Sequence, residues 1–508
     1  MNRRAEWTLF LLGALLLTAL HVVLYRHSGA LWRDEIHSVV VARMPGWRAM
    51  YGSLAIDSFP GLWAAVLRLW IGIGATDAWM RFLGFVLSVA VVIALWLNAR
   101  RTSPPVLALA FAAFNPAVFY YGSSLRAYGL ALLLVILLFG AVWRVIDRPR
   151  PFRIVAAVLL SILCANANYQ DSYLIFAVCT AGAVVCLAQR LWGRGALILG
   201  IGLAGALSLL PYVGIIRAYA VGGSIRQASP GVGAVWEQFC EAFDPARWAL
   251  LPLFLLLVLL ARRGRGALYG LLTVAISAAA LYRFVLASGL PTFPWHFVPF
   301  IGLAALALDF AADGAPRMAR MVVAAAAMAV SVYPLWNLAH LRRTNIDLAA
   351  DDVASVAAPR DFVFVSPFWF CYSFKYYYKG AAPWSILPLV PDDRIDLEYA
   401  AIKPLMEKPD PLAPAFAKIE RTLRSGGRVW IVGRMPGPPP GRQPPKIGPA
   451  PDPVHGWDNA WYMQVWAMQT NYFLHRHAAR FIVVPEEKGR PVNHLERAEI
   501  AMVEGWKD

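Results

Sequence analysis

Long apolar runs separated by short polar stretches recur through the first two thirds of the 508-residue chain. A helix of about 20 apolar residues crosses a hydrocarbon core of about 30 Å. The pattern therefore predicts an α-helical polytopic membrane protein. We place eleven spans at residues 7–25, 80–98, 104–121, 127–146, 154–169, 172–188, 195–215, 248–261, 266–286, 295–311 and 320–338.

One apolar segment, residues 60–74, differs from these spans. It is short, begins with Pro60 and carries Arg68 near its middle. Because a charge in the middle of a span is costly, we predict a juxtamembrane or re-entrant helix here. Two roles are left open for it: one wall of a groove for a lipid tail, or an ordinary interfacial amphipathic helix.

Positive charge between the spans indicates their orientation, because cytoplasmic loops are enriched in Lys and Arg. With the N-terminus in the cytoplasm, five short basic loops lie inside, at residues 98–101, 144–153, 190–194, 262–265 and 317–320. Counting residues 60–74 as a span would move the later basic loops outside. We therefore predict an uncleaved first span, a cytoplasmic N-terminus and an external C-terminal region.

The pattern changes after about residue 340. We expect a transmembrane module over residues 1–339, with a first external loop at 26–79, and a soluble extracytoplasmic α/β domain over 340–508. Alternation of short apolar and helical segments in this domain predicts strands and a helix. The strands are placed at 361–366, 426–433 and 480–485, the helix at 411–425, and a Pro- and Gly-rich loop or lid at 435–453.

Composition supports the membrane assignment. The chain is 59% hydrophobic and only 15% charged, whereas soluble domains carry about 25% charged residues. The net charge of +16 would suggest nucleic acid as the partner of a soluble protein. Here the basic residues lie mostly in short loops, so we interpret them as topology signals and contacts to membrane lipids, with no nucleic acid partner.

The predicted orientation brings several polar residues to the outer face. Adjacent carboxylates, Asp34 and Glu35, lie in the first external loop, and ionisable residues near membrane depth are functional candidates. The structural alternative is that Asp34 caps a helix that begins at Glu35. Four further polar residues belong to the same face: Arg126, Gln170, Asp171 and His296.

Four segments together resemble a known family. In chain order they read LWRDEIHSVVVA, DSFPGLWAAVLRLW, MRFLGFVLSVAVV and FNPAVFYYGSSLRAYGLALLL. They are similar to the bacterial branch of the GT-C glycosyltransferases, which includes the lipid A aminoarabinose transferase and is related to the protein O-mannosyltransferases. The resemblance covers roughly residues 5–190, and extends more weakly through 291–306 to the C-terminal domain.

The resemblance implies a hexosyl or pentosyl transferase of the bacterial inner membrane. Its donor would be a sugar on a polyprenyl phosphate, and its acceptor an envelope glycan, lipid or protein. The family's first-loop aspartate corresponds to Asp34, and a carboxylate near the attacking atom is a suitable base. Glu35 and Asp57 are the other candidate acids.

The departing phosphate needs cationic stabilisation. Arg126 is the first candidate, because its planar fork matches a phosphate, and Arg33, Arg68 and Arg81 are further candidates. Four residues complete the candidate site: Tyr128, Asp171, Gln170 and His296. For Tyr128 the structural alternative is an interfacial aromatic belt. The chain has no zinc-ligand spacing and no P-loop, so no cofactor is assigned and a divalent cation is left open.

The sequence departs from the family at three places. Relatives commonly have His-Pro-Pro or Lys-Pro-Pro at the juxtamembrane helix, where this chain has Ser58-Phe59-Pro60-Gly61. They often have Gln-Glu-Ala-Arg where this chain has residues 123–126, and Thr-His-Tyr where it has residues 168–171. These changes remove candidate metal or phosphate ligands. The alternatives are therefore a catalytically degenerate GT-C relative, or a transporter or flippase for a lipid-linked solute.

Overall fold

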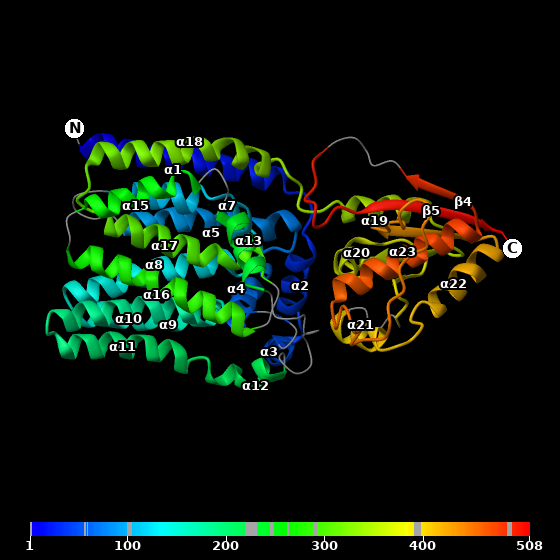
Figure 1. The fold of residues 1–508 in the computed structure, drawn as a ribbon, viewed down its shortest axis with the longest axis horizontal. Coiled ribbons are helices and arrows are strands. Elements are labelled where there is room, and N and C mark those ends of the chain that lie inside the picture. The colour runs from blue at the N-terminus through cyan, green and yellow to red at the C-terminus, as the bar shows by residue number, and fades with distance from the viewer. Residues whose placement is uncertain are drawn as a thin grey trace. The chain divides into compact units, whose positions relative to one another are not determined.

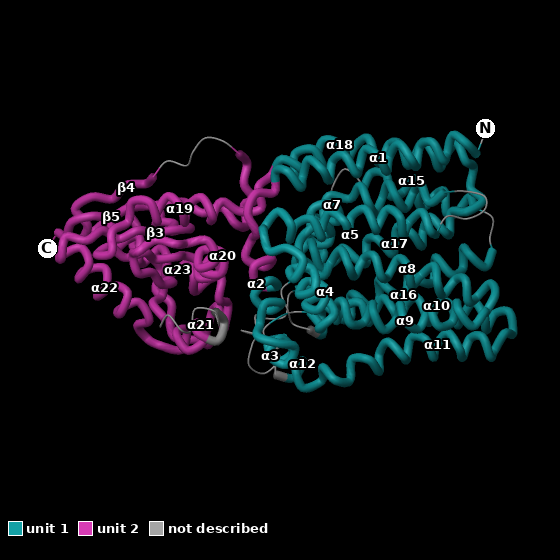
Figure 2. The backbone as a smooth tube through the Cα atoms, turned by 180° about the vertical axis from the view of Figure 1, so that it is seen from behind, with its two compact units in different colours: residues 1–27, 38–217, 229–340 teal, residues 28–37, 218–228, 341–508 magenta. Residues whose placement is uncertain are grey.

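The computed structural model describes residues 3–54, 57, 59–98, 104–218, 231–243, 248–261, 264–288, 292–390, 398–484 and 490–507. Parts of two predicted basic loops, at 99–101 and 262–263, lie outside the described residues. Internal contacts divide the chain into two units (Figure 2). Unit 1 comprises residues 1–27, 38–217 and 229–340, and unit 2 comprises residues 28–37, 218–228 and 341–508.

Unit 1 is built from helices, and its long helices lie side by side (Figure 1). Its elements are α1 (Arg3–His27), α2 (Arg33–Ala42), α3 (Gly46–Ser53), α4 (Gly61–Ile71), α5 (Asp77–Leu97), α6 (Val106–Ala108), α7 (Pro116–Gly122), α8 (Tyr128–Asp147), α9 (Pro151–Ala167), α10 (Asp171–Ala188), α11 (Trp192–Leu207), α12 (Val213–Ala218), α13 (Val232–Phe243), α15 (Leu251–Leu260), α16 (Arg265–Ser288), α17 (Val298–Ala311) and α18 (Arg317–Ala339). The division between the units falls inside α2, whose first residues belong to unit 2.

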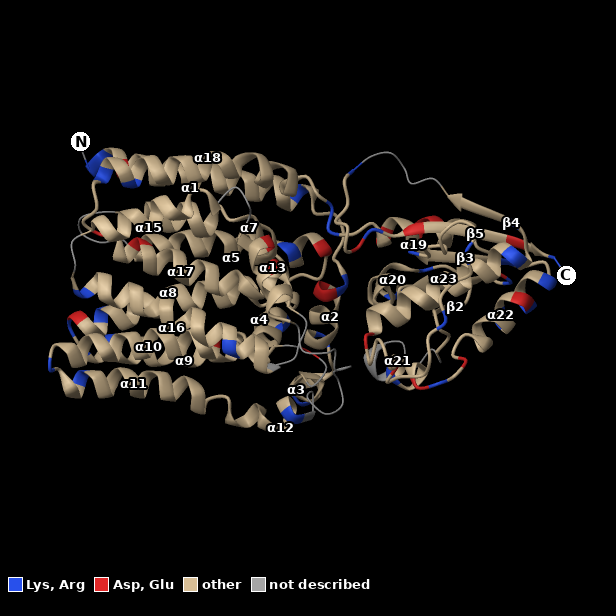
Figure 3. Ribbon diagram, in the orientation of Figure 1, with Lys and Arg blue, Asp and Glu red and all other residues tan. Residues whose placement is uncertain are grey.

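Eight helices in the described part of the chain are long and apolar enough to cross a membrane. They are α1, α5, α8, α10, α16 and α18, α11 together with its extension to Arg217, and α17 together with the turn from Pro294. Their charged residues lie mainly near the helix ends (Figure 3). The polytopic helical class is therefore confirmed.

The count of eleven is not confirmed. Every predicted span contains a helix, but α9 and α15 are shorter apolar helices of 17 and 10 residues. The predicted span 104–121 is interrupted, because α7 begins afresh after a π-helical turn, Leu109–Ala113. Asn115 caps this new start by accepting a hydrogen bond from the backbone N–H of Val118.

The segment predicted as a juxtamembrane helix forms α4. Trp63 and Leu67 are fully buried on one side of it, whereas Leu69 is 65% exposed. Arg68 donates from Nη1 to the backbone oxygens of Ala42 and Met44, at 3.1 and 2.7 Å. This arginine therefore holds the start of the segment after α2 against α4, and the position of α4 in a membrane stays a prediction.

Glycines allow close packing where α5, α7 and α8 meet. A Cβ on Gly84 of α5 would lie 2.0 Å from the backbone oxygen of Ser123, and a Cβ on Gly129 of α8 would lie 2.1 Å from that of Gly122. Small residues let backbones approach in this way. The contact fixes the turn between α7 and α8, which carries Arg126.

Unit 2 contains a five-stranded mixed sheet in the order β2-β1-β3-β5-β4. Its strands are β1 (Phe362–Ser366), β2 (Trp384–Ile386), β3 (Arg428–Gly433), β4 (Ala478–Val484) and β5 (Glu499–Trp506). Strand β1 pairs in parallel with β2 and β3, and β5 pairs antiparallel with β3 and β4. The predicted α/β class is confirmed for this part of the chain.

Helices cover both faces of this sheet. On one face, α19 (Ile346–Val356) and α20 (Cys371–Tyr377) pack on Val363 and Val365 of β1 and on Trp430 of β3. The other helices of unit 2 are α21 (Glu398–Met406), α22 (Ala413–Arg424) and α23 (Asn459–His477). Lys418 of α22 lies over the ring of Phe362, which alternates with Val363 and so points to the opposite face. Burial on both sides explains why β1 is buried at every position.

Three strands and one helix of this unit match the sequence predictions: β1, β3, β4 and α22. Residues 434–458 connect β3 to α23 with no helix or strand among the described elements, as predicted for the Pro-rich loop. Strands β2 and β5 were not predicted. Strand β5 carries Glu499, Glu504 and Gly505, which weaken its apolar pattern.

The glycine contact can be tested by Gly84→Ala. A methyl group at this position meets backbone rather than a flexible side chain, so we expect a loss of stability on the order of 1–3 kcal/mol and a lower Tm of the purified protein. Gly200→Ala in α11 is the control, because a Cβ there meets nothing within 4 Å. A Tm for Gly84→Ala equal to that of the control would contradict the close packing.

Candidate functional site

The acidic motif of the first loop lies in a segment, residues 28–37, that belongs to unit 2 by its contacts. The backbone N–H of Arg343 donates to the oxygen of Ser28 at 2.9 Å. The hydroxyl of Tyr377 accepts from the N–H of Leu31 at 2.8 Å. Residues far apart in the sequence therefore hold the backbone just before α2.

The two adjacent carboxylates have different environments. Glu35 is fully buried, accepts a hydrogen bond from the N–H of Trp32 at 3.2 Å and lies 3.6 Å from Nε of Arg343. The Asp34 side chain is 27% exposed, with Oδ1 3.4 Å from Nε of Arg33. Glu35 is thus buried with contacts to protein groups, whereas Asp34 is partly exposed to solvent.

Arg33 lies between two acids. Its Nε is 3.4 Å from Oδ1 of Asp34 and also 3.4 Å from Oε1 of Glu496. Its guanidinium stacks near the Trp369 ring, 5.8 Å from the ring centroid. Arg33 contacts both acids, so loss of the Glu496 side chain would free the guanidinium beside Asp34 from one of its two acidic contacts.

The carboxyl group of Glu496 has a raised pKa. Its pKa is raised to about 8, chiefly by burial; the charge of Arg33 opposes this rise, and the charge of Asp34 adds to it. Hydrogen bonds from Thr344 and Arg33 oppose the rise without cancelling it. The Glu496 carboxyl therefore holds its proton at neutral pH, because its burial outweighs the attraction of Arg33.

A second polar cluster lies in unit 1 around Arg126, which is 4% exposed. Its Nη1 donates to Oγ of Ser38 at 2.9 Å and lies 3.4 Å from Oδ1 of Asp57. The guanidinium sits over the ring of Phe59, 4.5 Å from the centroid. This is a desolvated cation with a carboxylate, a hydroxyl and an aromatic face around it.

Tyr128 and His296 extend this cluster. The Tyr128 ring lies edge-on to Phe59 at 5.4 Å and to His296 at 6.4 Å. Nδ1 of His296 accepts from the N–H of Phe293 at 3.2 Å, which caps the 3-10 turn Pro294–Phe297. The structure thus brings together four predicted residues: Asp57, Arg126, Tyr128 and His296.

Three tyrosines, Tyr51, Tyr169 and Tyr212, lie together near the start of α4. The Tyr169 and Tyr212 rings are 5.9 Å apart, and those of Tyr51 and Tyr212 are 5.8 Å apart. Tyr169 also lies close enough to Asp57 for the two groups to interact electrostatically. The Tyr212 hydroxyl accepts from the N–H of Gly61, at the start of α4.

The remaining predicted residues lie elsewhere in unit 1. Asp171 is buried at the start of α10, where the Asn168 amide donates to it at 3.1 Å and Cys164 Sγ lies 3.7 Å away. The N–H of Gln170 donates to Asn168 Oδ1 at 3.3 Å. Arg81 is partly buried on α5. Arg68 uses its guanidinium on the backbone, as described above, so its contacts are structural.

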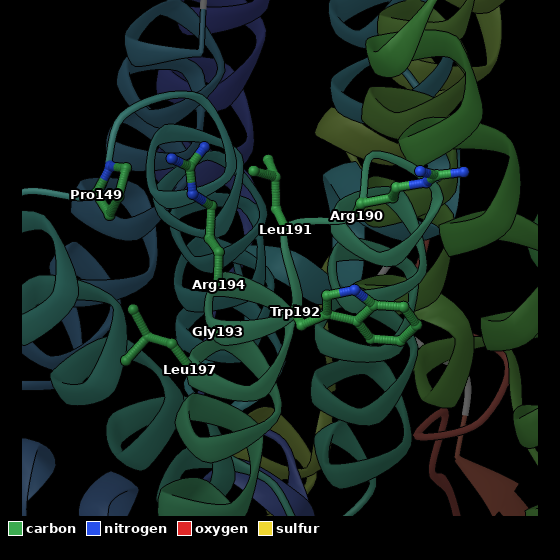
Figure 4. Close-up of a pocket in the computed structure, with 7 residues that line it drawn as sticks. All are labelled: Pro149, Arg190, Leu191, Trp192, Gly193, Arg194 and Leu197. Atoms are coloured by element: carbon green, nitrogen blue, oxygen red, sulfur yellow. The ribbon is translucent and has the colours of Figure 1, made fainter.

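No cluster of three or more His, Cys, Asp or Glu side chains in the described ranges is arranged to hold a metal ion. An open hollow of about 530 Å³ lies at the turn between α10 and α11 (Figure 4). Its lining includes Arg190, Trp192 and Arg194 but no carboxylate. It contains none of the predicted site residues and offers no acid or base for transfer chemistry.

Sequence reasoning missed Glu496, Arg343, Ser38 and Tyr169. Neither Glu496 nor Arg343 lies in a motif, and each is more than 300 residues from the acidic pair. The one usable signal was Tyr169, which stands beside the predicted Gln170 and Asp171.

The raised pKa of Glu496 predicts how stability depends on pH. Between pH 4.5, its ordinary value, and about 8, the folded protein holds a proton that the unfolded chain has lost. Unfolding then releases a proton, so stability falls as pH rises through this window. We expect Tm to decline from pH 6 to 8.5, and to decline less in Glu496→Gln, which cannot ionise. Equal slopes in differential scanning fluorimetry would contradict this assignment.

Comparison with known proteins reveals the fold. No family model matches the chain, and no curated protein sequence matches it. Among solved structures, ArnT from Cupriavidus metallidurans bound to undecaprenyl phosphate is similar, with a TM-score of 0.50 and 13% identity over 82% of this chain and 92% of that chain. The apo structure of the same protein gives 0.51 and 13%, over 85% and 93%. This chain therefore has the GT-C fold.

Proposed function

We propose that this protein is an integral-membrane glycosyltransferase that uses a polyprenyl-phosphate sugar. The observation that carries the proposal is the shared fold, which spans most of both chains and includes a structure with bound undecaprenyl phosphate. The acceptor is an envelope glycan, lipid or protein. The site faces the outside of the bacterial inner membrane, and unit 2 is extracytoplasmic.

Asp34 is the proposed base. It is the more accessible of the two adjacent carboxylates, with 27% of its side chain exposed. Glu35 is less suited, because its oxygens contact the Trp32 N–H and Arg343 and are fully buried. A base has to reach the proton that it removes, so we assign Glu35 to holding the segment and Asp34 to the chemistry.

Transfer replaces one bond at the anomeric carbon. A hydroxyl or amine of the acceptor attacks this carbon while the carbon–oxygen bond to the phosphate breaks. Asp34 takes the acceptor proton, and polyprenyl phosphate leaves with the bonding electron pair. The leaving group is already an anion, so it needs positive charge and donors rather than a proton.

Arg126 is the proposed contact for this phosphate. Burial against Phe59 strengthens its electrostatic interactions. Its pairing with Asp57 and Ser38 holds the guanidinium in one orientation, and a planar guanidinium can bind two phosphate oxygens at once. Asp57 is then an orienting acid rather than a second base.

Asp34→Asn tests the base. The amide keeps the size of the side chain and cannot accept a proton, so we expect sugar transfer from a polyprenyl-phosphate donor to fall by a factor of about 10²–10⁴. Protein yield and Tm are expected to match the wild type. Asp351→Asn, an exposed position on α19, is the control. Normal transfer by Asp34→Asn would rule out the assigned base.

The wild-type protein is assayed first with a panel of polyprenyl-phosphate sugars and native envelope acceptors. No turnover with any donor would contradict the proposed function. Lipid movement between leaflets in proteoliposomes would then identify a transporter or flippase, and its absence would indicate a degenerate relative.

Arg126→Lys tests the phosphate contact. Lysine keeps the charge but loses the planar fork, so we expect the KM for the lipid donor to rise roughly tenfold, about 1.4 kcal/mol. Arg153→Lys is the control, because Arg153 donates only to the backbone oxygens of Arg144 and Arg148 in its described contacts. An unchanged donor KM in Arg126→Lys would exclude the contact.

A further inference from the structure

The segment that carries Asp34 is held from several sides within unit 2. Gly29 forms a parallel bridge with Thr344. It has a φ of +72°, and a Cβ there would lie 2.6 Å from the guanidinium carbon of Arg342. Together with the hydrogen bonds of Ser28 and Leu31 described above, these contacts fix the backbone before α2.

Two side-chain contacts hold the segment against the rest of unit 2. The segment supplies the basic residue in one contact and the acidic residue in the other. The segment offers a cation, Arg33, to the acid Glu496, and an acid, Glu35, to the cation Arg343. Glu35, Arg343 and Glu496 are each at most 3% exposed. Removing Arg343 leaves the buried charge of Glu35 without compensation, and removing Glu496 takes away the protonated carboxyl that Arg33 contacts. The two contacts therefore constrain the segment strongly.

Glu496 is itself held rigidly. Its N–H donates to the oxygen of Asn493 at 3.0 Å, and Thr344 Oγ1 donates to its backbone oxygen at 3.3 Å. Ser373 of α20 lies 3.5 Å from its side chain. Two residues later, the N–H of Ala498 donates to the Asn345 side chain at 2.7 Å. The chain around Glu496 is thus an anchored support for Arg33.

From this arrangement we infer that Glu496 and Arg343 are positioning residues for residues 28–37 and set the conformation of Asp34 through Arg33 and Glu35. The inference rests on the proposed role of Asp34 as the base. Neither residue contacts the donor in this scheme: Arg343 holds the helix start through Glu35, and Glu496 keeps Arg33 in place beside the Asp34 carboxylate. The proposed base and the residues that position it would then all belong to unit 2.

The test measures backbone protection and turnover in the full-length protein in nanodiscs. Arg343→Ala and Glu496→Ala remove the contacts. We expect amide hydrogen exchange in residues 28–37 to become about tenfold faster or more, since local opening becomes easier, and kcat to fall about tenfold or more with donor KM within about twofold of wild type. A merely structural loss would also raise exchange in β1 and β3.

Conservative variants and a matched control sharpen the result. Arg343→Lys keeps the charge, and Glu496→Gln imitates the protonated acid at pH 7, so both are expected to recover most of the protection and kcat. Arg480→Ala removes an exposed pair with Glu504 in the same unit and is expected to behave as wild type.

Two outcomes would overturn the inference while the wild type is active. One is unchanged exchange in residues 28–37 in both alanine variants, and the other is faster exchange with an unchanged kcat. Failure of the proposed function looks different, because the wild type itself would then transfer no sugar from any donor, and the positioning role would fall with it.

Discussion

The structure depends on the pairing of charges that are buried where water cannot solvate them. An unpaired ion in such a place costs several kcal/mol, so each buried charge needs a partner, and the partner comes from a distant segment. Arg126 meets Asp57, and Glu35 meets Arg343. Both pairs join segments that lie far apart in the sequence.

The same constraint acts at other places in unit 1. Arg320 of α18 is 1% exposed and lies 3.3 Å from Glu6 of α1 and 3.0 Å from Asp309 of α17. Asp309 also accepts the backbone N–H of Ala108 at 3.1 Å. One buried arginine thus ties three long helices to the interrupted segment α6. This network has a structural role, whereas the network around Arg126 includes the candidate site residue Asp57.

In the first-loop motif, two residues that are adjacent in the sequence differ in burial. Asp34 and Glu35 are adjacent carboxylates on one helical turn. Their surroundings make Glu35 an anchor and leave Asp34 accessible, while Glu496 keeps its proton beside Arg33. The division of labour that we propose therefore arises from partners more than 300 residues away, and the GT-C fold brings them to the motif.

The sequence by itself determined the class of the protein and most of its elements. Apolar run length predicted the helices of unit 1, and apolar β-rich runs predicted β1, β3 and β4, because both signals are local. The acidic pair and Arg126 were found because charge in an apolar chain is conspicuous. Only the tertiary structure decided the interruption before Pro116, the placing of β5 between β3 and β4, and the grouping of residues 28–37 with unit 2. It also supplied Glu496 and Arg343. These features depend on contacts between distant residues, and no local pattern of hydrophobicity or charge carries that information.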